Sequence, residues 1–193
     1  RVIDASTAYR VDPAWTYGFA EMAPGQREKI AGATRVSNPG CYPTGFIGLA
    51  RPLVSAGIIP AGWPVTVNAV SGYSGGGKAM IAEFEDGSEP TGFRAYGLDL
   101  DHKHLPEMHR YSLVAKQPLF VPSVAHTYCG MLVSMPLPAS HFTRAGTTAQ
   151  QVWEVWEDYY RNCPFVRPVP PDQNVAHLRE GKYLDLEGCN FTN

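Results

Sequence analysis

Cys41 lies in a segment typical of a positioned nucleophile, which reads Ser-Asn-Pro-Gly-Cys-Tyr-Pro-Thr-Gly over residues 37–45. Gly40 removes side-chain bulk beside the sulfur, and Pro43 and Thr44 suit the first turn of a helix. Unpaired backbone N–H groups at a helix start favour the thiolate and lower the pKa of a cysteine below its free value of roughly 8.5. The thiolate is the form that attacks a carbonyl carbon. The segment therefore predicts covalent catalysis by Cys41, in preference to the common alternative of a buried structural cysteine.

A catalytic thiol needs an imidazole as acid and base, and two histidines stand close together in the run His-Lys-His-Leu-Pro-Glu-Met-His over residues 102–109. A metal site is the alternative for this cluster, and we regard it as weaker. His104 is slightly preferred as the proton shuttle because its Leu-Pro neighbours would hold it at a fixed helix start. His102 is nearly as good, so the choice between the two stays open.

The segment Gly-Tyr-Ser-Gly-Gly-Gly-Lys-Ala over residues 72–79 has the glycine and lysine spacing of a phosphate-binding P-loop. Ala79 stands where a P-loop needs Ser or Thr to reach magnesium, so a nucleotide triphosphatase is disfavoured. Successive backbone N–H groups in a glycine-rich turn can still bind an anion, and Lys78 adds a full charge. We expect a mobile or ligand-binding loop here, with a plain surface loop as the alternative.

The composition excludes several other classes of protein. Of 193 residues, 44% are hydrophobic and 18% charged, with a formal net charge of −2. Lys and Arg form no basic stripe for nucleic acid, and no apolar run approaches the roughly 20 residues that span a bilayer. Without a visible signal peptide, we expect a cytoplasmic protein. The cysteines at 41, 129, 163 and 189 show no ligand-like spacing, which predicts neither a metal site nor a disulfide framework.

Hydrophobic patterning outlines the elements that would position these groups. It predicts helices over 45–56, from 102 onward and over 147–160, and strands over 65–70, 119–125 and 128–137. The strands 119–125 and 128–137 are expected to be antiparallel neighbours. Residues 1–6 read as the end of a strand, 8–36 as irregular with a helical stretch around 25–31, and the part after 164 as short strand-like pieces. The fold class is α+β, with a mixed, largely antiparallel sheet covered by helices.

Five motifs in order along the chain carry a resemblance to a known family. They are residues 4–10 (Asp-Ala-Ser-Thr-Ala-Tyr-Arg), 15–18 (Trp-Thr-Tyr-Gly), 37–45, 71–75 (Ser-Gly-Tyr-Ser-Gly) and 102–107. On them the chain resembles the N-acetyl-gamma-glutamyl-phosphate reductases, in the shorter of their two forms. These enzymes reduce an acyl phosphate to a semialdehyde in arginine biosynthesis.

The resemblance implies a domain organisation. Family members join a Rossmann domain for NADP to a catalytic domain like those of glyceraldehyde-phosphate and aspartate-semialdehyde dehydrogenases. Residues 1–36 are then expected to be a remnant of the Rossmann domain's edge, and residues 37–193 the catalytic and dimerisation domain without its C-terminal return segment. No strand here precedes a G-x-G-x-x-G run, so the NADP site would lie largely outside this chain, which we expect to be inactive alone. The family also implies a homo-oligomer, a dimer or a tetramer.

The resemblance also implies a role for each site residue. The Cys41 thiolate attacks the acyl phosphate, phosphate leaves, and NADPH reduces the resulting thioester, while His104 or His102 exchanges the proton. Phosphate would be held by Arg10 and Lys78, the cleft would be lined by Ser71, Gly72 and Ser74, and Gly75 would lie nearest the cofactor. Two alternatives remain, which are a related aspartyl-phosphate or aldehyde dehydrogenase and a noncatalytic assembly module.

Overall fold

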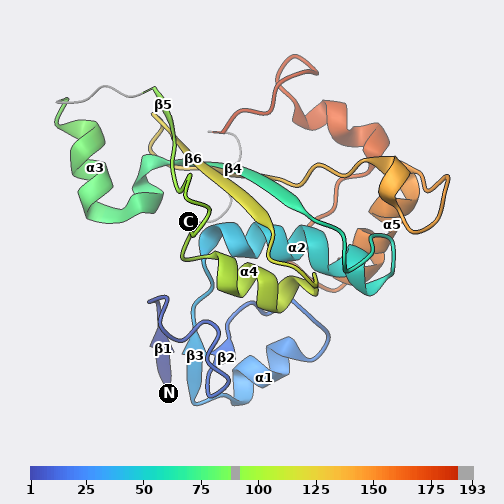
Figure 1. The fold of residues 1–193 in the computed structure, drawn as a ribbon, viewed down its shortest axis with the longest axis horizontal. Coiled ribbons are helices and arrows are strands. Elements are labelled where there is room, and N and C mark those ends of the chain that lie inside the picture. The colour runs from blue at the N-terminus through green and yellow to red at the C-terminus, as the bar shows by residue number, and fades with distance from the viewer. Residues whose placement is uncertain (88–91, 187–193) are drawn as a thin grey trace.

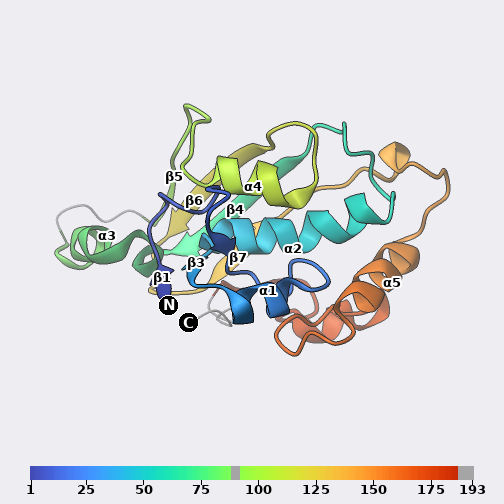
Figure 2. The same ribbon diagram turned by 90° about the horizontal axis from the view of Figure 1, so that it is seen from below.

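A computed structural model describes residues 1–87 and 92–186, which fold into two sheets with helices between and beside them (Figure 1). The smaller sheet has three strands in the order β1-β3-β2, and the larger has four in the order β5-β6-β4-β7. Helices α2 and α4 lie between the two sheets (Figure 1), and α3 projects from one end of the larger sheet (Figures 1 and 2). Cys189 lies outside the described residues.

The smaller sheet is built from the first part of the chain. Its elements are β1 (Val2–Asp4), β2 (Thr16–Tyr17), α1 (Gln26–Gly32) and β3 (Arg35–Ser37). The central strand β3 pairs in parallel with β1 and with β2. The strand at the start and the helix near 25–31 are confirmed, while β2 and β3 replace part of the predicted irregular segment. The assignment of residues 1–36 to a Rossmann domain's edge stays a prediction.

Helix α2 (Cys41–Ser55) begins four residues before the predicted start at Gly45. Gly40 is its N-cap, in an extended conformation with φ −70° and ψ 149°. Pro43 can lie in the first turn because backbone N–H groups there have no helical partner to lose. The side chains of Phe46, Ile47, Ala50 and Leu53 follow at helical spacing and are fully buried. Cys41 is therefore the first residue of a helix that is anchored in the core.

The larger sheet is mixed, as predicted. It consists of β4 (Thr66–Gly72), β5 (Phe93–Ala95), β6 (Leu119–Ala125) and β7 (Met131–Ser134). Strand β4 pairs in parallel with β6 and antiparallel with β7, and β5 pairs antiparallel with β6.

The prediction that residues 119–125 and 128–137 form neighbouring strands was wrong, because β4 lies between them. The connection between β6 and β7 crosses the end of β4. The backbone N–H groups of Gly72 and Tyr73 donate to the carbonyls of Gly130 and Thr127, both at 2.9 Å. A Cβ atom on Gly72 would lie 2.6 Å from the backbone of Cys129, so only glycine fits beneath this connection.

Two further expectations are corrected. The glycine-rich segment is not a loop, since Gly72 ends β4 and is followed by the 3-10 helix η1 (Tyr73–Gly76) and by α3 (Gly77–Glu85). Residues 164–186 form no named strand. They contain the 3-10 helix η3 (Pro171–His177) and a single bridge between Arg179 and Tyr183.

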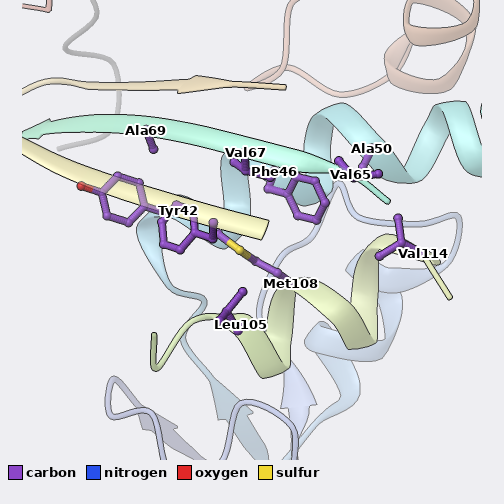
Figure 3. Packing of buried hydrophobic residues seen from close by; sticks show 10 residues of the cluster. Tyr42, Phe46, Ala50, Val65, Val67, Ala69, Leu105, Met108 and Val114 are labelled. Carbon is purple, nitrogen blue, oxygen red and sulfur yellow. The ribbon is translucent and has the colours of Figure 1, made fainter. Parts of the chain in front are cut away.

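The core lies where α2 and α4 (Leu105–Ser112) face the larger sheet. Tyr42 and Phe46 of α2 meet Val67 of β4 and Leu105 and Met108 of α4 (Figure 3). Helix α4 begins three residues after the predicted position 102, so both candidate histidines precede it. This core fixes the starts of α2 and α4 relative to each other.

The remaining helices lie beyond that core. The short 3-10 helix η2 (Ala139–His141) leads to α5 (Ala149–Tyr160), which packs beside α2. Helix α5 opens with a capping box between Thr148 and Gln151, close to the predicted start. In the part of the chain that the structure describes, no helix is long and apolar enough to cross a membrane.

Candidate active site

The start of α2 opens into a cleft of about 320 Å³, here called the thiol cleft. Six of the predicted site residues line it: Arg10, Cys41, Ser71, Gly75, His102 and His104. They come from the N-terminal segment, α2, β4, η1 and the loop before α4. A larger groove of about 540 Å³ lies between the end of α2 and α5, but none of the predicted site residues lines it. We therefore place the candidate chemistry in the thiol cleft.

Three predicted residues do not line the thiol cleft. Gly72 is buried at the end of β4, and Ser74 lies in η1. Lys78 is exposed in the first turn of α3. The prediction placed Lys78 near the thiol because residues 72–78 were interpreted as one glycine-rich, anion-binding loop, whereas Lys78 lies in α3, beyond η1.

Sequence reasoning missed several residues of the cleft, namely Tyr42, Gly76, Met80, Tyr96, Lys103 and Val124. Tyr42 and Lys103 are next to predicted site residues in the sequence, so they could have been predicted to line the cleft. Tyr96 and Met80 could not, because only the pairing of β5 with β6 and the turn into α3 bring them to the thiol.

The Cys41 thiol is subject to opposing influences on its pKa. Burial raises the pKa above its usual value, whereas the backbone N–H groups of Tyr42 and Cys41 and the charge of Arg10 lower it. The predicted cause, N–H groups at a helix start, is present. The predicted direction was wrong, because desolvation of the sulfur outweighs those groups even though part of the residue is exposed.

His104 is the more enclosed of the two histidines. It is buried, and burial together with the neighbouring charges of His102, Arg10 and Lys103 lowers the pKa of its imidazole to about 3. Its Nδ1 atom is buried without a hydrogen-bond partner among the described residues. Its ring lies against the start of α2, since a Cβ atom on Gly40 would be 2.8 Å from His104 Cδ2. His104 is thus a neutral imidazole with one unmatched nitrogen beside the thiol's helix.

His102 has a different environment. Its Nδ1 accepts the backbone N–H of His104 at 3.2 Å, which leaves the proton of a neutral ring on Nε2. The two imidazole centroids are 4.7 Å apart. Burial and the charge of Lys103 lower the pKa of His102, so it too is mainly neutral at pH 7.

Arg10 is held by a buried carboxylate that the sequence left unassigned. Its Nη1 donates to Glu107 Oε1 at 2.8 Å, and its Nε donates to the carbonyl of Asn38 at 2.9 Å. Glu107 is almost wholly buried, with 1% of its surface exposed. Arg10 Nη2 also donates to the carbonyl of Ala5 at 3.4 Å, so each guanidinium nitrogen has a protein partner, while the residue lines the thiol cleft.

Tyr42, the second residue of α2, also lines the thiol cleft. The Tyr42 hydroxyl lies 3.0 Å from the carbonyl of Ser123 and 2.8 Å from Ser71 Oγ. Because a carbonyl can only accept, Tyr42 donates to Ser123, and its oxygen is free to accept from Ser71. Burial raises the pKa of Tyr42, so it stays a neutral phenol. These bonds fix the Ser71 side chain at the edge of the thiol cleft.

No three His, Cys, Asp or Glu side chains among residues 1–87 and 92–186 are grouped so that they could hold a metal ion.

The mixed sheet with helices on one face, and a thiol at a helix start, define an α+β domain of the semialdehyde dehydrogenase type. Solved structures share this fold. Aspartate semialdehyde dehydrogenase II from Vibrio cholerae matches with a TM-score of 0.55 and 19% identity, over 81% of this chain and 52% of that chain. Its complex with ASA matches with a TM-score of 0.53 and 15% identity, over 86% and 54%.

The chain belongs to the semialdehyde dehydrogenase dimerisation-domain family, whose model matches residues 41–190. Among its relatives is N-acetyl-gamma-glutamyl-phosphate reductase 2 of Nostoc sp., 46% identical over all of this chain and 62% of the relative. Another is the N-acetyl-gamma-glutamyl-phosphate reductase of Rhizobium etli, 51% identical over 97% of this chain and 61% of the relative. The chain thus spans about three fifths of the length of these relatives.

Proposed function

We propose that this chain carries the acyl-transfer part of a reductase that converts N-acetyl-gamma-glutamyl phosphate to N-acetylglutamate semialdehyde with NADPH, a step of arginine biosynthesis. The observation that carries the proposal is the placing of Cys41 at a helix start in one cleft with His104, His102 and Arg10. The names of relatives at 46% and 51% identity support the choice of substrate.

The proposed first step is attack of the Cys41 sulfur on the acyl carbon of the substrate. A carbon–sulfur bond forms and the bond from carbon to the phosphate oxygen breaks. Inorganic phosphate leaves, and the acyl group remains on Cys41 as a thioester. Backbone N–H groups at the start of α2 already face the sulfur, as their effect on its pKa indicates. Such groups are suited to stabilise the negative charge that develops on the acyl oxygen.

His104 is proposed to accept the thiol proton. Its imidazole is neutral in the empty cleft because its pKa is about 3, so the ring is available as a base. A phosphate group bound nearby would raise that pKa, since an opposite charge favours the protonated ring. Substrate binding would therefore strengthen the base at the moment it is needed. His102 remains the alternative acid/base group, but with its Nδ1 accepting the His104 backbone N–H, its Nε2–H is oriented to donate a proton and not to accept one.

Phosphate is proposed to bind between Arg10 and Lys103, which both line the thiol cleft. Lys103 is better placed for this than Lys78, the lysine that the sequence favoured. Ser71 lines the same cleft, and Gly72 and Ser74 continue from it into η1. Gly75 is retained as the residue nearest the cofactor.

The fit to a dinucleotide is poor within this chain. No strand among residues 1–87 and 92–186 precedes a G-x-G-x-x-G run, and Gly75 and Gly76 are the glycines that border the cleft. The requirement for NADPH is therefore proposed for the full-length protein, and the steps assigned to the residues of this chain end at the thioester. The cytoplasmic location expected from the sequence also remains a proposal.

The test is a comparison of acyl phosphates with the full-length protein. NADPH oxidation with N-acetyl-gamma-glutamyl phosphate should exceed that with aspartyl phosphate by at least about 10²-fold in kcat/KM, as expected when a site rejects a substrate with a mismatched polar group. Equal or reversed preference would favour the aspartyl-phosphate alternative. Turnover of neither substrate would favour the assembly module.

A further inference from the structure

Glu107 has no role in the chemistry above, yet it is the most deeply buried acidic side chain near the thiol. It lies in the first turn of α4, is 1% exposed, and does not line the thiol cleft. A buried charge persists in a protein only when it is paired and hydrogen-bonded. The role of Glu107 therefore depends on the groups that it pairs with.

The Glu107 carboxylate accepts hydrogen bonds from three segments that are far apart in the sequence. Arg10 Nη1 donates to Oε1 at 2.8 Å, and the Tyr17 hydroxyl donates to Oε2 at 2.7 Å. The backbone N–H of Gly40 also donates to Oε2, at 2.9 Å. Gly40 is the N-cap of α2, and Cys41 is its next residue. One carboxylate thus ties the N-terminal segment, β2 and the start of α2 to α4.

The side chains around this carboxylate are closely packed against Gly40. A Cβ atom on Gly40 would lie 2.6 Å from Glu107 Oε1, 2.8 Å from Arg10 Nη1 and 2.8 Å from His104 Cδ2. The carboxylate, the guanidinium and the imidazole therefore all meet the backbone at Gly40. A shift of Glu107 would therefore also shift Gly40, and with it the Cys41 thiol and the N–H groups beside the cleft.

We propose that Glu107 is a positioning residue that fixes the Gly40–Cys41 helix start and the Arg10 guanidinium in a single geometry. This role goes beyond the proposed function, on which it rests only for its effect on turnover. A carboxylate is suited to it because both oxygens accept and neither donates. Glutamine has one accepting oxygen, so in either orientation its NH₂ group would face at least one of the three donors.

The test compares Glu107→Gln with wild type in the full-length protein. Site-resolved mass spectrometry follows the alkylation of Cys41 by iodoacetamide as a function of pH, and hydrogen exchange follows the amide of Gly40. We expect the Gly40 amide to exchange at least about tenfold faster, because a hydrogen bond that protects it is lost. We also expect the alkylation midpoint to differ from that of wild type, because Glu107 holds Arg10, and both charges act on the pKa of the thiol.

Glu21→Gln is the matched control. Glu21 is 11% exposed at its side chain and pairs with Arg27 at 3.1 Å, so the same chemical change is made in another acid–arginine pair that does not line the thiol cleft. It should leave both readouts unchanged. If Glu107 only stabilised the fold, Glu107→Gln would lower the free energy of unfolding without changing the exchange of the Gly40 amide in the folded protein.

The proposal is overturned if the Gly40 amide in Glu107→Gln exchanges at the wild-type rate. If Glu107→Gln does not fold, Tyr17→Phe provides the decision. It removes one donor and keeps the ring that stacks on Tyr111 at 4.0 Å. The Gly40 amide should then exchange about threefold faster, and wild-type exchange would refute the proposal.

These readouts need no substrate, so they decide on Glu107 even if the full-length protein reduces no acyl phosphate, which would overturn the proposed function alone. Where turnover is present, kcat of Glu107→Gln should fall by about 10- to 100-fold with KM changed less than about threefold, as expected for a misplaced nucleophile.

Discussion

At the scale of single residues, the thiol cleft combines a cysteine and two histidines that are all neutral when the cleft is empty. Burial raises the pKa of Cys41 and lowers those of His102 and His104. A neutral thiol is a weaker nucleophile than a thiolate. The thiol should become reactive when a bound anion raises the pKa of His104, because the imidazole can then accept the thiol proton.

The buried His104 predicts a loss of stability in acid. Its pKa is about 3 in the folded chain and about 6.5 in an unfolded one, so the unfolded state binds more protons between those values. Stability should therefore be fully present above pH 6.5 and fall as the pH drops toward 3. Within that window, each unit by which the pH falls lowers the free energy of unfolding by about 1.4 kcal/mol. Urea denaturation of wild type and His104→Gln at pH 7.5 and 5.5 measures it, and equal pH dependence in the two proteins would contradict the assignment.

The Tyr42 hydroxyl predicts a second effect at this scale. Tyr42→Phe would remove one donor from the Ser123 carbonyl and release Ser71, which we expect to cost about 1–3 kcal/mol of unfolding free energy. Tyr159→Phe is a suitable control, because its hydroxyl donates to the carbonyl of Met22 away from the thiol cleft. Both variants should lose stability, but only Tyr42→Phe should also alter KM. An unchanged KM in Tyr42→Phe would argue against a role for Ser71 in the cleft.

At the scale of elements, the sequence predicted the helices, strands and helix caps that depend on local residue patterns. The apolar residues of 45–56 and the β-branched run 65–70 became α2 and β4, and Thr148 with Gln151 capped α5. The order of the strands was not predictable in the same way. The short connection after β6 indicated a hairpin, but it instead crosses the end of β4, where Gly72 permits close approach.

The crossing over β4 can be tested at Gly72. Gly72→Ala would bring a methyl group within 2.6 Å of the backbone of Cys129, which cannot move aside as a flexible side chain can. We expect a loss of about 1–3 kcal/mol in unfolding free energy, the usual cost of overpacking. Gly62→Ala, where no atom lies within 4 Å, should change stability by less than about 0.5 kcal/mol. Equal effects in both variants would contradict the described crossing.

At the scale of the whole molecule, the larger sheet is covered by α2 and α4 on one face (Figure 1). Along β6, Phe120 faces those helices and is buried, while the alternate residue Leu119 is 45% exposed. On β5, Phe93 is 59% exposed. The family model is that of a dimerisation domain, which supports oligomerisation, and we expect the face that carries Leu119 to form the contact.

That contact predicts the behaviour of two matched variants. Leu119→Lys would place a charge in the interface and should shift the full-length protein toward monomer, because burying an unpaired charge is costly. Phe165→Lys changes a side chain that is 85% exposed and lies outside the larger sheet, so the assembly should persist. Sedimentation velocity measures both. An unaltered assembly in Leu119→Lys would exclude this face as the contact.

The central claim, that Cys41 is acylated by the substrate, is tested most directly by mass spectrometry of the protein quenched after mixing with N-acetyl-gamma-glutamyl phosphate in the absence of NADPH. We predict an N-acetylglutamyl thioester on the peptide that contains Cys41, absent from the peptides that contain Cys129 and Cys163 and absent from Cys41→Ser. An acyl adduct that forms equally in Cys41→Ser, or full reductase turnover by that variant, would contradict the account.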